Sequence, residues 1–260
     1  MRPLAPLLVV LVALSGCKRS AGPQELIVFA AASLQTAFAE LGLAFERAHP
    51  DVTVRFAFAG SQALRTQIEH AADGAVDVFA SADWRTIDAL EASGRVEAPM
   101  TFARNEPVVV VRRNAQPALP DFDALPRVER LVLAAPEVPI GAYARTILQR
   151  ASRTRGESFG ATVLARLVSN ELDTRQVLAK VALGEADAGI VYRTDVRPTD
   201  AVAVLTIPAD ALVLASYPAA VVTRSDTPAQ ARAFVDWLRG ADAQAILRRH
   251  GFLPPDEAAR

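Results

Sequence analysis

Short apolar runs alternate with segments of helical periodicity through the first third of this chain, and this alternation restricts the fold most strongly. The runs at 25–29, 52–58 and 77–80 have the length and residue types of strands. Each is followed by a segment with apolar residues at helical spacing, at 34–48, 61–72 and 84–93. This order predicts an α/β fold in which a mostly parallel sheet is covered by helices.

The rest of the chain continues the same alternation. Further strands are predicted at 107–111, 131–134, 188–192, 203–206 and 213–222, and further helices at 142–152, 174–183, 228–239 and 241–250. Asp173 is placed to cap the helix that begins at Thr174. The polar segment 150–160 is predicted to be a surface loop.

Composition excludes two broad classes. With 51% hydrophobic and 22% charged residues, the chain is typical of a globular protein and not of a disordered one. Its formal net charge of −1 gives no basic excess for a nucleic-acid backbone, so no nucleic-acid partner is expected. The length of 260 residues allows one large domain or two lobes of about 100–130 residues each.

The N-terminal segment has the pattern of a bacterial export signal. Arg2 precedes an uncharged apolar run at 4–14, which is shorter than the about 20 residues that a membrane-spanning helix needs. The sequence LSGC at 14–17 looks like a lipobox, and Cys17 is the only cysteine. We therefore expect a signal peptide at 1–16, lipidation of Cys17 and a polar tether at 17–24. A plain signal peptide that leaves a soluble periplasmic protein is the alternative.

Two serines stand where a predicted strand passes into a predicted helix. Ser33 and Ser61 occupy these junctions, which lie at the carboxyl edge of a parallel sheet. The first N–H groups of a helix lack internal partners and carry partial positive charge, so such junctions bind anions. Serine is also a preferred helix cap, so for each serine alone simple capping remains open.

Five sequence blocks resemble the periplasmic molybdate-binding proteins of ABC transporters, in order and in approximate spacing. The resemblance extends from Glu25 to about Pro254. The blocks are 28–34 (VFAAASL), 58–64 (FAGSQAL), 77–83 (DVFASAD), 138–144 (VPIGAYA) and 184–195 (GEADAGIVYRTD). Any one block is weakly specific, but five in order are highly specific.

The resemblance implies a set of five uncharged donors to a tetrahedral oxyanion. Ser33 and Ser61 would donate through hydroxyl and amide groups, and Tyr192 through its phenol. Ile140 stands where the family usually has alanine, and Thr174 where it usually has valine; both would donate their backbone N–H. Molybdenum would reach the protein only as the oxyanion held by these groups.

The resemblance also implies the fold and the partners. It predicts the two-lobed, type II fold of periplasmic binding proteins, with ligand in the cleft between two α/β lobes. The first lobe would be 24–105 with 215–260 and the second 106–214, with crossing strands near 107–111 and 213–222. We expect a monomer that binds molybdate or tungstate, uses no cofactor, is anchored to the membrane by its lipid and docks on an ABC permease.

Other readings of the sequence are weaker. His49, His70 and His250 lie in no recognisable catalytic motif, so a secreted hydrolase is not favoured. An iron receptor would need clustered tyrosines, and the three tyrosines are scattered along the sequence. Sulfate, thiosulfate or a phosphonate remain alternative ligands of the same fold. Capping, turn and surface contacts are expected, in place of metal ligation, for Asp77, Asp83, Asp187 and Asp195.

Overall fold

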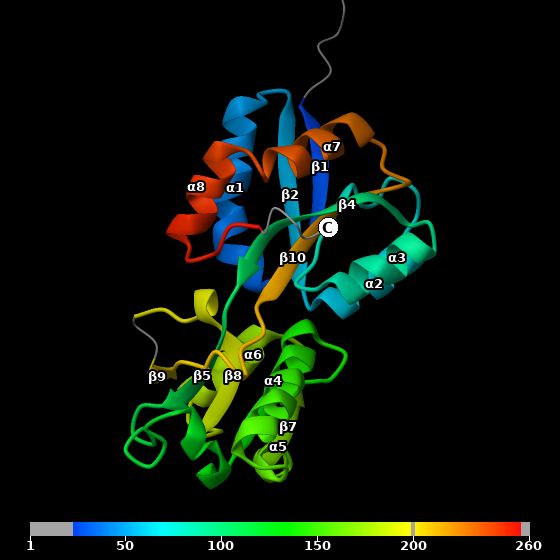
Figure 1. The fold of residues 1–260 in the computed structure, drawn as a ribbon. Coiled ribbons are helices and arrows are strands. Elements are labelled where there is room, and N and C mark those ends of the chain that lie inside the picture. Colours follow the sequence, from blue (N-terminus) through cyan, green and yellow to red (C-terminus); the bar gives the residue numbers. More distant parts are fainter. Residues whose placement is uncertain (1–22, 199–200, 256–260) are drawn as a thin grey trace, which may run out of the picture.

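The computed structural model describes residues 23–198 and 201–255, which form two α/β lobes (Figure 1). The predicted signal peptide and Cys17 lie outside the described residues. So does most of the predicted tether, but Gln24, expected to end it, begins the first strand. No helix of the described part has the length and apolar character needed to cross a bilayer.

The first lobe contains a five-stranded sheet in the order β2-β1-β3-β10-β4. Strand β1 is parallel to both of its neighbours, whereas β10 is antiparallel to β3 and β4. The strands are β1 (Gln24–Ala31), β2 (Val52–Ala59), β3 (Val78–Ala80), β4 (Val96–Asn105) and β10 (Ala215–Val222). The helices of this lobe are α1 (Gln35–Ala48), α2 (Ser61–His70), α3 (Trp84–Ala92), α7 (Pro228–Trp237) and α8 (Ala241–Arg249).

The second lobe repeats this plan with the order β7-β6-β8-β5-β9. Strand β6 is parallel to both of its neighbours, and β5 is antiparallel to β8 and β9. The strands are β5 (Pro107–Arg112), β6 (Leu131–Ala134), β7 (Leu167–Glu171), β8 (Ala188–Tyr192) and β9 (Val202–Leu205). The helices are α4 (Pro139–Arg155), α5 (Phe159–Leu164) and α6 (Thr174–Ala182). The predicted α/β class is confirmed, and each sheet also contains one strand, β10 or β5, that is antiparallel to both of its neighbours.

Helices cover both sheets, so the central strands are apolar along their whole length. All four valines at 108–111 in β5 are fully buried, as are Leu131, Val132 and Leu133 in β6. In the first lobe, Phe38 and Phe45 of α1 pack edge-on against Phe234 of α7. A sheet buried on both faces requires such continuous apolar strands, and this explains why short apolar runs identified them in the sequence.

The chain crosses between the lobes twice. A single residue, Glu106, separates β4 from β5, and the second crossing runs from β9 to β10. Strands β4 and β10 pair where they leave the first lobe (Figure 1). The register of that pair shifts between Tyr217 and Pro218, because proline has no N–H for the ladder and is accommodated at a bulge.

Four elements differ from the sequence prediction. Residues 150–155 of the expected surface loop continue helix α4, with Ala151 buried and Arg150 and Arg153 exposed. The helix ends at Gly156, whose φ of 99° favours glycine. The helix α5 and the strand β7 were not predicted. They have only 6 and 5 residues, too few for their apolar residues to show a clear period in the sequence. Strand β4 was also missed, because Ala98 with φ 49° and Pro99 interrupt its pattern.

Candidate functional site

A small cavity lies between the two lobes and brings together all five residues predicted from the sequence. Its volume is about 220 Å³, including the space open to solvent. Pockets for drug-sized ligands are larger, from about 300 Å³ upward. The first lobe contributes Ala31, Ala32, Ser33, Gly60, Ser61 and Ala82, and the second contributes Val138, Pro139, Ile140, Asp173, Thr174 and Tyr192. The size suits a small ligand.

Four helix starts surround the cavity, each after a parallel strand. They are the 3₁₀ turn Ala32–Leu34 before α1, and the first residues of α2, α4 and α6. Pro139 opens α4 and has no N–H, so Ile140 carries the first N–H of that helix. These amides lie in the first helical turn, where no backbone carbonyl of the helix can accept from them. Their partial positive charge favours an anion in the cavity.

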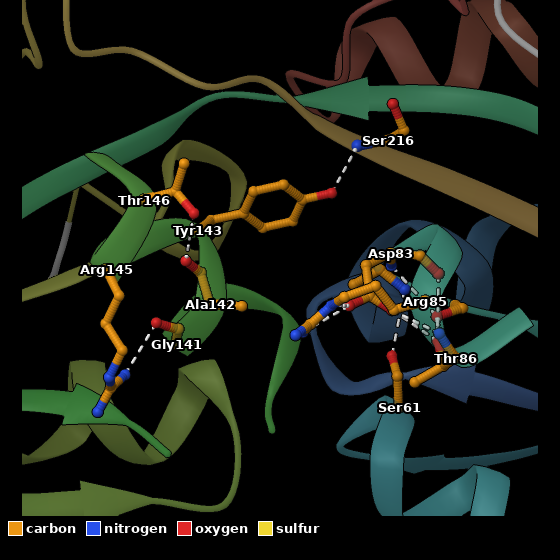
Figure 2. Close-up of polar contacts among 12 residues, drawn as sticks. Ser61, Asp83, Arg85, Thr86, Gly141, Ala142, Tyr143, Arg145, Thr146 and Ser216 are labelled. Atoms are coloured by element: carbon orange, nitrogen blue, oxygen red, sulfur yellow. Dashed lines mark hydrogen bonds and ion pairs between the residues drawn. The ribbon is translucent and has the colours of Figure 1, made fainter. Parts of the chain in front are cut away.

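Neither serine caps a helix, so the simple capping alternative is wrong. Ala31 and Gly60 occupy the cap positions, and neither start has a side-chain capping bond. Ser61 Oγ accepts the backbone N–H of Ala82 at 3.1 Å (Figure 2). Ser33 Oγ lies 2.9 Å from Tyr217 Oη. The Ala82 N–H can only donate, so the hydrogen of the Ser61 hydroxyl is free to point elsewhere.

Tyr192 presents a buried phenol with unused hydrogen-bonding capacity. The residue is 2% exposed, and its Oη has no partner among the described residues. Burial raises the pKa of Tyr192 well above its ordinary value, so the group keeps its proton. An unpaired buried hydroxyl costs about 1–3 kcal/mol, which a ligand accepting from it would recover.

Thr174 has its hydroxyl committed within the second lobe. Thr174 Oγ1 donates to Asp195 Oδ2 at 2.7 Å, and the N–H of Tyr192 donates to the same oxygen at 3.1 Å. The Thr174 hydroxyl is therefore bonded within its own lobe, and only the backbone N–H of Thr174 is left for a ligand. Asp195 is partly buried as a residue, and burial of its carboxyl group raises its pKa to about 7.

One acidic residue on the cavity wall was not among the predicted site residues. Asp173 caps α6 as the sequence predicted, and its Oδ1 accepts the N–H groups of Arg175 and Gln176 at 2.8 and 3.0 Å. Its Oδ2 accepts from the Gln176 side-chain amide at 3.0 Å. The carboxylate is thus bound to the start of the helix, and the helix dipole offsets its charge.

The aspartates of the sequence blocks have structural contacts. Asp77 accepts from the Ile27 N–H at 2.7 Å and from Ser225. Asp83 caps α3 through the Thr86 N–H (Figure 2). Asp187 pairs with two arginines, Arg112 and Arg130, each at 2.9 Å. Within residues 23–198 and 201–255, no three His, Cys, Asp or Glu side chains form a group that could hold a metal ion.

The three tyrosines, although scattered along the sequence, come close together in the structure. The Tyr192 and Tyr217 rings pack edge-on with centroids 5.6 Å apart. The Tyr143 Oη accepts the N–H of Ser216 at 3.3 Å (Figure 2). Tyr217 and Tyr143 thus have partners, and Tyr192 alone of the three has a phenol without a partner among the described residues.

Two α/β lobes with two crossings and a cavity of converging donors between them define a cleft-type solute-binding protein. The model of the bacterial extracellular solute-binding protein family matches residues 26–253. The chain belongs to this family. The molybdate-binding protein ModA of Mycobacterium tuberculosis is 37% identical over 237 residues, which cover 90% of this chain and 86% of that protein.

Solved structures share the fold at lower identity. The periplasmic molybdate-binding protein of Azotobacter vinelandii superimposes with a TM-score of 0.72 at 19% identity, covering 89% of this chain and all of that one. The sulfate-binding protein SubI of Mycobacterium tuberculosis gives a TM-score of 0.78 at 18% identity, covering 90% and 88% of the two chains. The fold therefore accommodates more than one tetrahedral oxyanion, and it does not by itself define the ligand.

Proposed function

We propose that this protein captures molybdate, and tungstate equally, outside the cytoplasm for an ABC importer. The observation that carries the proposal is the set of donors around one small interlobe cavity: Ser33, Ser61, Ile140, Thr174 and Tyr192. The relative from Mycobacterium tuberculosis named as a molybdate-binding protein supports this ligand over sulfate or thiosulfate. We also propose that the chain binds its ligand without chemical conversion.

Uncharged donors suit this ligand for a physical reason. Molybdate is fully ionised near neutral pH and offers only acceptor oxygens, so the protein needs donors alone. Hydrogen bonds to a charged group contribute about 1.5–3 kcal/mol each. Several such bonds exceed the cost of ordering the complex, and no cationic side chain is needed. Both lobes supply donors, so the anion stabilises the closed form.

Contacts across the mouth of the cleft are consistent with a closed form. Gln62 Nε2 in the first lobe donates to the Leu172 carbonyl in the second at 3.0 Å. Arg197 Nη2 donates to Thr36 Oγ1 at 3.3 Å, again between the lobes. We propose 24–105 with 215–260 as the first lobe and 106–214 as the second. The closed monomer would dock on the permease subunits.

Titration calorimetry with molybdate, tungstate, sulfate and phosphate tests the ligand. We expect heat with molybdate and tungstate at one site per chain, and weak or no heat with sulfate and phosphate. Sulfate is smaller, so a cavity preorganised for molybdate would leave its donors too far from the sulfate oxygens. Heat with sulfate, and none with molybdate or tungstate, would contradict the proposal.

We further propose that Cys17 is acylated and tethers the mature protein to the cell membrane. The LSGC sequence at 14–17 supports this. Cell fractionation of the native protein and of Cys17→Ser tests the anchor. The native protein should stay with the membranes and the variant should be released. A native protein found in the soluble fraction would instead favour plain secretion.

A further inference from the structure

A chain of buried polar side chains runs behind Ser33 and through both interlobe crossings. It begins at Asn105, the last residue of β4, which is fully buried. The N–H of Glu106 donates to Asn105 Oδ1 at 2.9 Å. A backbone N–H can only donate, so this contact identifies Oδ1 as the oxygen and fixes the orientation of the amide.

The amide nitrogen of Asn105 therefore faces two oxygens as a donor. It lies 2.7 Å from Thr194 Oγ1 in the second lobe and 3.4 Å from Tyr217 Oη on β10. An amide nitrogen has two hydrogens and can serve both partners. The contact with Thr194 joins the first crossing to the residues that follow Tyr192.

Tyr217 then has one hydrogen and one remaining partner. The residue is fully buried, and burial raises the pKa of its phenol well above its ordinary value, so it keeps its proton. Since Tyr217 Oη accepts from Asn105, its hydrogen is directed to Ser33 Oγ at 2.9 Å. Ser33 Oγ thus acts as an acceptor on its buried side, and its own hydrogen faces the cavity.

We propose that Asn105 and Tyr217 are positioning residues that fix the direction of the Ser33 hydrogen bond, so that this donor favours oxyanions carrying no proton. This inference rests on the proposed function and concerns the same cavity. A fully ionised oxyanion accepts from Ser33. An oxyanion that keeps a proton, such as phosphate near neutral pH, needs an acceptor that Ser33 does not offer in this direction.

The two serines differ in how firmly this direction is set. The backbone N–H of Ala82 holds Ser61, and no side-chain substitution reverses that donor. Ser33 Oγ is contacted on its buried side by a side chain, Tyr217, which is contacted in turn by Asn105. One substitution can therefore reverse the direction of these hydrogen bonds. In Asn105→Asp the carboxylate accepts a hydrogen bond from the Tyr217 hydroxyl. Ser33 then donates to Tyr217 Oη, and a lone pair of Ser33 Oγ is left to face the cavity.

The test compares molybdate and phosphate affinity by calorimetry in native protein, Asn105→Asp and Tyr217→Phe. We expect the ratio of molybdate to phosphate affinity to fall by at least about tenfold in Asn105→Asp, since one bond to a charged ligand changes from donation to repulsion. Tyr217→Phe keeps the ring that packs on Tyr192 and frees Ser33 Oγ to accept, so its ratio should fall by a smaller factor.

Tyr143→Phe is the matched control. It removes another, partly buried phenol, whose partner is the Ser216 N–H (Figure 2). This phenol does not line the interlobe cavity. Its affinity ratio should equal that of the native protein. A loss of both affinities in equal proportion in Asn105→Asp and Tyr217→Phe indicates a merely structural role and overturns the inference alone. A native protein that binds neither molybdate nor tungstate overturns the proposed function and this inference with it.

Discussion

In the first lobe the proposed donors Ser33 and Ser61 offer side-chain hydroxyls in addition to backbone N–H groups, whereas the second lobe offers the backbone N–H groups of Ile140 and Thr174 with one phenol. Each serine oxygen has a second partner behind the cavity, Tyr217 or Ala82. The second lobe instead relies on the first turns of α4 and α6. Two donors of the first lobe therefore depend on residue identity, whereas the donors at Ile140 and Thr174 in the second depend on backbone geometry.

The two departures from the family pattern that the sequence resemblance indicates both fall where the proposed donor is a backbone N–H. Ile140 and Thr174 stand in the second lobe, where the side chain need not touch the ligand. The Ile140 side chain is 1% exposed and packs in the core, and the Thr174 hydroxyl bonds Asp195. A backbone donor tolerates such changes as long as the helix start keeps its position. A hydroxyl donor does not.

The largest effect is expected from removing both hydroxyls of the first lobe. Ser33→Ala with Ser61→Ala should lower molybdate affinity on the order of a thousandfold, because two hydrogen bonds to a charged ligand are lost. Calorimetry measures the change, and circular dichroism checks the fold. An unchanged affinity would place the binding site elsewhere and remove the basis of the comparison.

A proline substitution tests the backbone donor of the second lobe. Thr174→Pro removes the N–H at the first position of α6, where proline is well tolerated. Asp173 has φ −158° and ψ 171°, an extended conformation compatible with a following proline. Affinity should fall by about tenfold or more.

Thr174→Val is its matched control, because it keeps the N–H and removes the hydroxyl that bonds Asp195. Its affinity should fall by less than about threefold, with a loss of stability of about 1 kcal/mol from the hydrogen bond. If the valine variant binds as weakly as the proline variant, the hydroxyl is the donor and the second lobe resembles the first.

Tyr192 is the exception in the second lobe, since its donor is a side chain without a partner in the described structure. Tyr192→Phe should weaken molybdate binding about tenfold. In the ligand-free protein the same change should raise the free energy of unfolding by about 1 kcal/mol, because it removes an unpaired buried hydroxyl. Calorimetry and urea unfolding of the ligand-free protein measure the two effects. A variant that is both weaker in binding and less stable would mean that the phenol has a structural partner.

The sequence predicted the parts of this molecule that depend on local pattern. The junctions at Ser33 and Ser61 and the cap at Asp173 follow from residues close in the chain. The contacts of Tyr217 with Ser33 and Asn105 join residues 184 and 112 positions apart, so no local pattern could predict them. Strand β4 was missed for a related reason: its partner β10 is distant in sequence, and Ala98 breaks its alternation.

The last prediction concerns stability, not affinity, and the charge behind the second lobe. Burial raises the pKa of Asp195 to about 7, above its ordinary 3.8. Between these values the folded state holds a proton that the unfolded state releases, so this group's contribution is present at low pH and is lost as the pH rises toward 7. Asp195→Asn keeps an oxygen that can accept from Thr174 and Tyr192 but does not titrate. Urea unfolding at pH 5 and pH 8 should show a larger loss of stability in the native protein than in the variant. Equal losses would mean that the pKa of Asp195 has its ordinary value. The donors of both lobes would then be positioned without a contact that depends on protonation.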